Sequence, residues 1–141
     1  MLFPKKVKFR KWHRMRRNPN KKLVATRGVK VSFGSYGLKT SEAGEISSNQ
    51  IEAVRRVLTR YVQKTGKMWV RIFPDKPLTK KPAEVTMGGG KGDPSSYVVD
   101  VMPGRVMFEL DGVSEVDAKE AFRKASSKLS LKVRFVSREN Q

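Results

Sequence analysis

The uneven distribution of charge limits what this chain can fold into more than any other feature of its sequence. The 141 residues carry a formal net charge of +18. Residues 1–41 contain 13 Lys or Arg and no acid, residues 42–92 contain 10 basic and 5 acidic residues, and residues 93–141 contain 8 of each. Uncompensated like charges repel one another and oppose compaction. We therefore expect the cationic first third to face a polyanionic partner in a directional contact.

Residues 1–28 are predicted to form an extended basic arm. They show no helical or strand period, and Phe3, Phe9 and Trp12 are interleaved with the basic residues. Lysine and arginine neutralise phosphates, and aromatic rings stack on exposed bases, so this composition favours an arm that lies along RNA. The alternative is a disordered, solvated tail, for which the aromatic residues are poor choices. His13, the only histidine, has no motif around it that would make it a catalytic base.

Residues 29–141 are treated as one domain, and the clearest element in it is a helix that ends before Gly66. Apolar residues recur at helical spacing from Ile51 to Val62, which indicates a core-facing stripe. Basic residues at steps of four occupy the opposite face, where either solvent or phosphates are expected. Two capping boxes are available at its start, Ser47 with Gln50 or Asn49 with Glu52.

The remaining elements predict an α+β fold with two helices on a mixed or antiparallel sheet. Alternation over 29–38 predicts a strand with a glycine bend, and 41–48 reads as a polar loop. Two apolar runs around Pro103-Gly104 read as an antiparallel hairpin. A second helix capped by Ser114 follows, then a last strand over 131–136 and a short polar tail.

The stretch from Lys67 to Asp93 combines three kinds of local sequence. Residues 67–73 read as a strand, because they are rich in β-branched and aromatic types. The prolines and lysines that follow predict an irregular, stiff spacer, within an exposed loop that we expect to span 74–96. Four glycines surround Lys91, which allows the backbone a close approach to nucleic acid; a floppy linker is the alternative. A phosphate loop for a nucleotide is disfavoured, since the required hydroxyl and the following helix are both missing.

Several classes of chemistry find no support in the sequence. The absence of cysteine excludes disulfides and thiolate metal sites. Paired carboxylates and metal-ligand spacings are not evident, so we expect no cofactor, no small-molecule substrate and no enzymatic activity. No apolar run approaches the roughly 20 residues of a membrane span, and no membrane partner is expected.

Several motifs, in this order and spacing, carry a resemblance to a known family: MLFPKKVKFRKWHR, VSFGSYGL, QIEAVRR, GKMWVRIFPDKP and MGGGKG. With them, the chain closely resembles the bacterial large-subunit ribosomal protein L-sixteen, of the universal uL-sixteen family. The resemblance implies an α/β-hammerhead type of α+β fold, a cytoplasmic location in the ribosome and a structural role without catalysis. It implies late incorporation into the subunit. The implied partners are large-subunit ribosomal RNA, neighbouring ribosomal proteins, and the transfer RNA of the aminoacyl site, with the peptidyl site left open.

The candidate contacts with ribosomal RNA come from the arm, the first helix and the central stretch. They are Lys5, Lys6, Lys8, Arg10, Lys11, Trp12, His13, Arg14, Arg16, Arg17, Arg27, Arg55, Arg56, Arg60, Lys64, Arg71, Lys76, Lys80 and Lys81. By resemblance, a second group near the peptidyl-transferase centre would approach transfer RNA. Its members are Thr86, Met87, Gly88, Gly89, Gly90, Lys91 and Gly92.

One position departs from the family pattern. Bacterial members usually have arginine directly before the Met-Gly pair, where this chain has Thr86. The hydroxylation that some members carry on that arginine therefore cannot occur here, and the loop lacks one cation.

Two other functions stay open at this point: a free-standing RNA chaperone, which would leave the RIFPDKP segment without a role, and a nucleotide-dependent enzyme, which the glycine cluster does not support.

Overall fold

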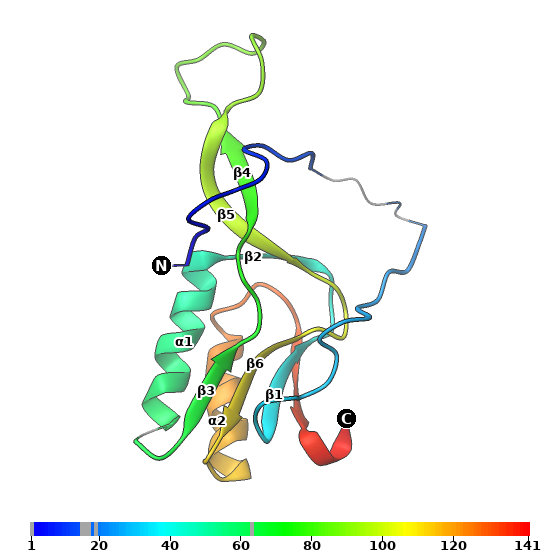
Figure 1. Ribbon diagram of the computed structural model, residues 1–141, viewed down its shortest axis with the longest axis vertical. Helices are drawn as coiled ribbons and strands as arrows, with labels where there is room; N and C mark the ends of the chain where they lie inside the picture. Colours follow the sequence, from blue (N-terminus) through cyan, green and yellow to red (C-terminus); the bar gives the residue numbers. More distant parts are fainter. Residues whose placement is uncertain (1, 15–17, 19, 63) are drawn as a thin grey trace.

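The computed structural model describes residues 2–14, 18, 20–62 and 64–141, and the two predicted contacts Arg16 and Arg17 lie outside this part of the chain. Two antiparallel sheets and two helices make up the α+β fold (Figure 1). The elements in chain order are β1 Tyr36–Thr40, β2 Gly44–Ser47, α1 Ser48–Val62, β3 Lys67–Val70, β4 Lys76–Lys80, β5 Asp93–Val101, β6 Val106–Asp111, α2 Glu115–Ser126, β7 Val133–Ser137 and the 3-10 turn Arg138–Asn140.

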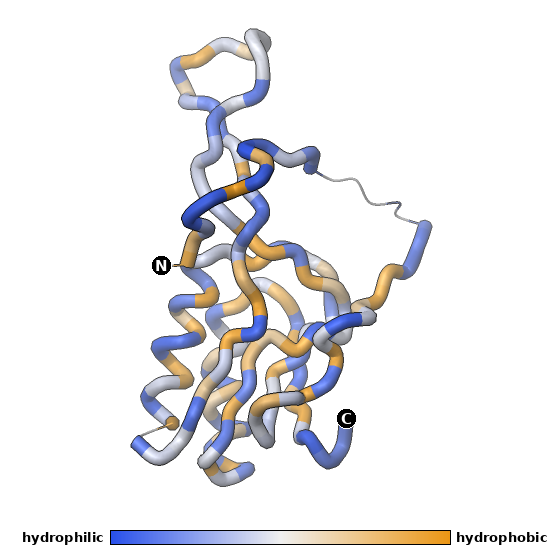
Figure 2. Tube along the Cα trace, in the orientation of Figure 1, coloured by the Kyte–Doolittle hydropathy of each residue, from blue (hydrophilic) through white to orange (hydrophobic). Residues whose placement is uncertain are grey.

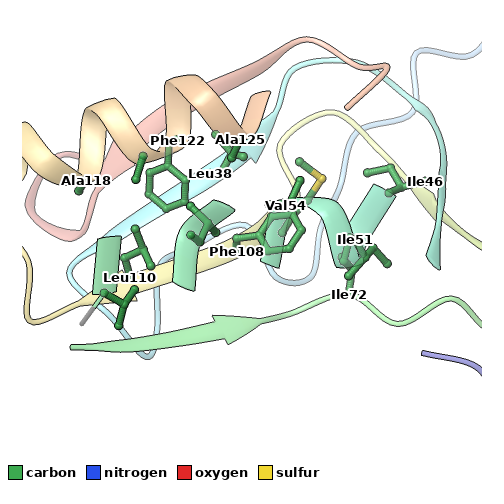
Figure 3. Close-up of a cluster of buried hydrophobic side chains, with 14 of the residues drawn as sticks. Leu38, Ile46, Ile51, Val54, Ile72, Phe108, Leu110, Ala118, Phe122 and Ala125 are labelled. Atoms are coloured by element: carbon green, nitrogen blue, oxygen red, sulfur yellow. The ribbon is translucent and has the colours of Figure 1, made fainter. Parts of the chain in front are cut away.

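The main core lies between the two helices and the four-stranded sheet, whose strand order is β3-β6-β1-β7. Figure 3 shows Phe108 and Leu110 of β6, Val54 of α1 and Phe122 of α2 pointing toward one another. All four side chains are at most 1% exposed. Burying a side chain of this size stabilises the fold by about 1.5–3 kcal/mol relative to leaving it in water, so this layer supplies the rigid platform for the rest of the molecule.

Both helices begin as their sequences predict. At α1 the structure selects the Ser47–Gln50 capping box: the Ser47 amide donates to Gln50 Oε1 at 3.0 Å, and the Gln50 amide donates to Ser47 Oγ at 3.3 Å. At α2 the Asp117 amide donates to Ser114 Oγ at 3.2 Å. Each cap satisfies backbone donors that have no partner inside the helix.

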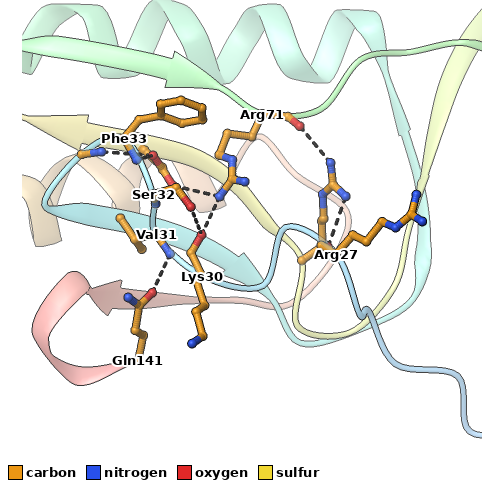
Figure 4. A network of polar contacts seen from close by, with 10 residues as sticks. Arg27, Lys30, Val31, Ser32, Phe33, Arg71 and Gln141 are labelled. Carbon is orange, nitrogen blue, oxygen red and sulfur yellow. Dashed lines mark hydrogen bonds and ion pairs between the residues drawn. The ribbon is translucent and has the colours of Figure 1, made fainter.

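The strand predicted over 29–38 begins only at Tyr36, and the reason is a buried carboxylate. Glu109 of β6, which is 0% exposed, accepts hydrogen bonds from the amides of Ser32, Phe33 and Gly34 at 2.8–3.1 Å. Those amides therefore cannot join a strand ladder. Segment 28–35 instead runs alongside β6: the Val106 amide donates to Gly28 O at 2.8 Å, and the Ser35 amide donates to Leu110 O at 2.9 Å. Figure 4 shows part of the polar network that holds this segment.

The predicted hairpin around Pro103-Gly104 is wrong. Strand β5 belongs to the three-stranded sheet, whose order is β2-β5-β4, whereas β6 lies in the four-stranded sheet. The Gly104 amide donates to Thr40 O at 2.8 Å, and the Thr40 amide donates to Arg105 O at 2.9 Å. The turn thus bonds to the end of β1 and carries the chain from one sheet to the other.

Two segments expected to be irregular are strands. Gly44–Ser47, within the predicted polar loop 41–48, forms β2 and pairs with the end of β5. Lys76–Lys80, within the predicted loop 74–96, forms β4 and pairs with the start of β5. Pro77 is tolerated there because β4 is an edge strand, where a missing amide donor costs no ladder bond. The exposed loop is therefore shorter than predicted, and it runs from the end of β4 at Lys80 to the start of β5 at Asp93.

Two smaller expectations also change. The strand predicted over 67–73 ends at Val70, although the Arg71 amide still donates to Met107 O at 2.8 Å. The polar tail is not free, because the Val31 amide donates to Gln141 Oε1 at 2.6 Å. The C-terminus therefore helps to hold segment 28–35 in place.

Candidate nucleic-acid interface

The β4–β5 hairpin projects from the body and ends in the glycine-rich tip (Figure 1). Gly88, Gly89 and Gly90 adopt φ values of +99°, +72° and +103°, a region that side-chain-bearing residues rarely enter. A Cβ atom added to any of the three would meet no atom within 4 Å. Met87 is fully exposed at 100%. The glycines are therefore required by the backbone conformation of a free-standing tip, and not by packing within the protein.

The N-terminal arm lies across this hairpin near its tip (Figure 1). Lys11 Nζ donates to the carbonyl oxygen of Lys91 at 2.9 Å, and Lys91 Nζ in turn donates to the carbonyl oxygen of Trp12. Arg10 pairs with Asp93, the first residue of β5, at 2.9 Å. We call these four residues and Trp12 the clasp. The clasp joins the arm and the tip, two segments about 80 residues apart in the chain, into one surface.

Beyond the clasp, the described part of the arm leaves most of its cations exposed. Lys5, Lys6 and Lys8 are exposed, and no described carboxylate pairs with any of them. Phe3 and Phe9 are 63% and 59% exposed. Figure 2 shows the same pattern as a hydrophilic tube interrupted by isolated hydrophobic positions. Exposed cations alternating with exposed rings are suited to phosphates and unpaired bases, respectively.

Lys76 differs from the arm lysines, because its charge is compensated inside the protein. Its side chain is 8% exposed, and its Nζ lies 2.8 Å from Glu45 Oε1 and 3.2 Å from Asp100 Oδ2. Burial alone would lower the pKa of Lys76, but the hydrogen bonds to Glu45 and Asp100 raise it above its ordinary value. The bond from Lys76 also lowers the pKa of Glu45. This cation joins β2, β4 and β5, and its predicted contact with ribosomal RNA stays a prediction.

Arg71 has a similar structural role on the other sheet. Its guanidinium lies 3.0 Å from Glu109 Oε1 and donates to the carbonyl oxygen of Lys30 at 2.5 Å (Figure 4). It also lies over the Phe33 ring, 5.4 Å from the centroid, and Phe33 stacks on Trp69. Arg71 thus holds segment 28–35 against the sheet, and an RNA contact would have to share it with these partners.

The basic face of α1 divides into compensated and free cations. Glu52 lies 2.6 Å from Arg55 and 3.4 Å from Arg56, and the hydrogen bond from Arg55 lowers the pKa of Glu52 to about 2. Arg60 and Lys64 are exposed and pair with no described carboxylate. They are the members of this face that stay available to an external anion.

The other candidates are distributed around these features. His13, Arg27 and Lys80 are exposed, and Arg14 pairs with Glu45 at 3.2 Å. Lys81 Nζ donates to the Gly88 carbonyl oxygen at 2.5 Å across the base of the tip, and Thr86 is exposed in the tip. Sequence reasoning missed Asp93, whose only signal is that it is the acid adjoining the glycine cluster.

The described residues contain no set of three His, Asp or Glu side chains arranged to hold a metal ion. Likewise, no helix within those residues has the length and hydropathy needed to cross a membrane. Exposed cations, exposed rings and a side-chain-poor tip define a polyanion-binding structural protein.

A comparison with known protein families identifies the family to which the chain belongs. The model of the family "Ribosomal protein L16p/L10e" matches residues 4–136, nearly the whole chain, so this protein belongs to that family. It is therefore a structural, RNA-binding protein of the large subunit of the cytoplasmic ribosome, with a part in translation and no enzymatic activity.

Proposed function

We propose that this protein binds large-subunit ribosomal RNA directly through its arm, and that its glycine tip reaches toward transfer RNA in the aminoacyl site. The observation that carries the proposal is the clasp. Lys11 and Lys91 bond to each other's chain segments, so the exposed part of the arm and the tip lie at the same end of the molecule. Ribosomal RNA that holds the arm would therefore also set the position of the tip.

The tip is suited to an approach limited by space. From Thr86 to Gly90 it has no charged side chain, and the ammonium group of Lys91 is turned back to the Trp12 carbonyl. Contacts from this segment would come from backbone amides and from Met87. The glycine backbone can come close to a folded RNA where side chains would collide. The loss of the family's usual arginine at Thr86 fits a tip that acts by shape and backbone.

The finer parts of the resemblance belong to the same proposal. They are the hammerhead type of the fold, incorporation late in subunit assembly, and contacts with neighbouring large-subunit proteins. The described contacts of Arg10 and Lys11 with the hairpin, and of Arg14 with Glu45 of β2, support an arm that is held by the domain rather than a separate tail.

The test uses two variants with different expected defects. Replacing Lys5, Lys6 and Lys8 by Gln should weaken binding to large-subunit ribosomal RNA and reduce the slope of log K against log salt by about two. The control removes the same charge elsewhere, through Lys132→Gln, Arg134→Gln and Arg138→Gln, and should keep a steeper slope.

Met87→Glu should leave RNA binding unchanged but slow transfer-RNA accommodation on reconstituted ribosomes, because it places a negative charge at the tip. Equal slopes for the arm variant and its control would reject the arm as an RNA contact. A Met87→Glu defect confined to subunit assembly would reject the role of the tip.

A further inference from the structure

The two helices share a basic groove on the helical layer of the molecule. It has a volume of about 450 Å³ and is lined by Arg60 and Tyr61 of α1 and by Arg123, Lys124, Ser127 and Lys128 at and after the end of α2. Every charged side chain in this lining is a cation. Of these four cations, only Arg60 was among the candidate RNA contacts predicted from the sequence.

Three of the four cations have no counter-charge within the described part of the chain. Lys124 lies 3.2 Å from Glu120, whereas no described carboxylate pairs with Arg60, Arg123 or Lys128. All three are exposed. Like charges that converge on one hollow repel one another in the free protein, and a bound anion would relieve this repulsion.

The helix dipole does not account for the whole arrangement. Cations in the last turn of a helix are favoured by the carbonyl groups there, which explains Arg123 and Lys124 as residues of α2. It does not explain why a cation of α1 converges on the same hollow. Lys124 Nζ also lies 5.3 Å from the centre of the Tyr61 ring, so the two walls of the groove are in direct contact.

We propose that this groove binds the phosphate backbone of an RNA segment different from the segment bound by the arm. The guanidinium groups of Arg60 and Arg123 can each grip a phosphate through two parallel hydrogen bonds, and Lys128 adds a point charge. The hydroxyls of Tyr61 and Ser127 are of the type that contacts phosphate and sugar oxygens. Cations on two helices are suited to successive phosphates of a strand, whereas the groove has no glycine-rich amide cradle for a single nucleotide.

The position of the groove indicates its role, which rests on the proposed function. The arm and the tip lie at the hairpin end, and the groove lies on the helices that cover the four-stranded sheet (Figure 1). Two RNA segments held at these two places would be fixed relative to each other by the rigid core between them. The protein would then act as a bridge between two parts of the ribosomal RNA.

The test compares the groove variant, Arg60→Gln, Arg123→Gln and Lys128→Gln, with the control that replaces Lys132, Arg134 and Arg138 by Gln. Both lose three positive charges, and all six side chains are exposed, so thermal midpoints should stay near the wild-type value. The groove variant should bind large-subunit ribosomal RNA about tenfold more weakly than the control, with a salt slope lower by about two to three. Hydroxyl-radical footprints should lose protection at nucleotides different from those lost with the Lys5, Lys6 and Lys8 variant.

Three other outcomes would contradict the proposal. Equal affinities for the groove variant and the control would overturn the inference, while the arm variant would still decide the proposed function separately. Loss of the same nucleotides in both footprints would reduce the two surfaces to one and reject the bridge. Normal RNA binding with failed incorporation into the subunit would assign the groove to a protein partner instead, which also contradicts the proposal.

Discussion

The α+β body and the first residues of the arm contain the same types of cation but place them in opposite environments. In the body, the buried Lys76 and the half-buried Arg71 lie beside carboxylates at 2.8–3.2 Å and hold strands or segments together. In the arm, Lys5, Lys6 and Lys8 are exposed, with no described carboxylate beside them. The difference shows that a cation's availability for RNA depends on whether the fold brings an acid to it, and not on its residue type.

Among the variants that test this comparison, removal of the most deeply buried acid should lower the free energy of unfolding the most. Glu109→Gln removes the fully buried carboxylate that pairs with the half-buried Arg71 and accepts three amide hydrogen bonds, and breaking a buried pair in this way costs about 3–5 kcal/mol. The free energy of unfolding, measured with urea, should fall by that amount. The matched control is Glu115→Gln, whose exposed partner is Lys119, and its cost should be at most about 1 kcal/mol. Similar losses in the two variants would show that Glu109 has no special structural role.

Two lysines of the same strand separate structural from RNA-binding cations. Lys76→Met leaves Glu45 and Asp100 without their shared cation and should lower the free energy of unfolding by about 1–3 kcal/mol. Lys80→Met, in an exposed position at the end of β4, should change it by no more than about 0.5 kcal/mol. In RNA binding, the order should reverse, with the larger loss for Lys80→Met. If Lys76→Met weakened RNA binding more while remaining folded, the distinction drawn here would be wrong.

The smallest expected effect is on the stability of the fold at acidic pH. Because the folded pKa of Glu52 is about 2, below its ordinary value of 4.5, the ion pair with Arg55 stabilises the fold above pH 4.5. This contribution is lost as the pH falls through the interval from 4.5 to 2. Glu52→Gln should therefore flatten the decline of the thermal midpoint in that interval, whereas Glu84→Gln in the exposed tip loop should not. An unchanged decline in Glu52→Gln would assign the acid sensitivity to other carboxylates.

Local sequence was sufficient to predict the two helices and the glycine-rich tip. The Ser47–Gln50 and Ser114–Asp117 caps and the apolar stripes lie within a few residues of one another, so no distant information is needed to recognise them. The conformation of Gly88–Gly90 likewise depends on each residue's own backbone freedom. The charge gradient, too, is a property of the chain alone, and the polyanionic partner that it indicates agrees with membership of an RNA-binding ribosomal family.

Long-range pairing accounts for the errors. Nothing next to Pro77 in the sequence shows that β4 is an edge strand, and nothing near 29–35 shows that Glu109 takes its amides. The turn at Pro103-Gly104 resembles a hairpin turn locally, but its backbone bonds go to Thr40. In each case, the deciding partner lies tens of residues away.

By itself, the sequence determined two amphipathic helices, a cationic first third, a side-chain-poor tip and a family resemblance that the match over residues 4–136 confirms. Only the tertiary structure decided that the strands divide into two sheets, that Lys76 and Arg71 hold the body together, and that the arm and tip meet at the Lys11–Lys91 clasp. The physical reason is that helix propensity and backbone freedom act within a few residues. The compensation of a charge depends on which distant groups the folded chain brings within about 4 Å of it.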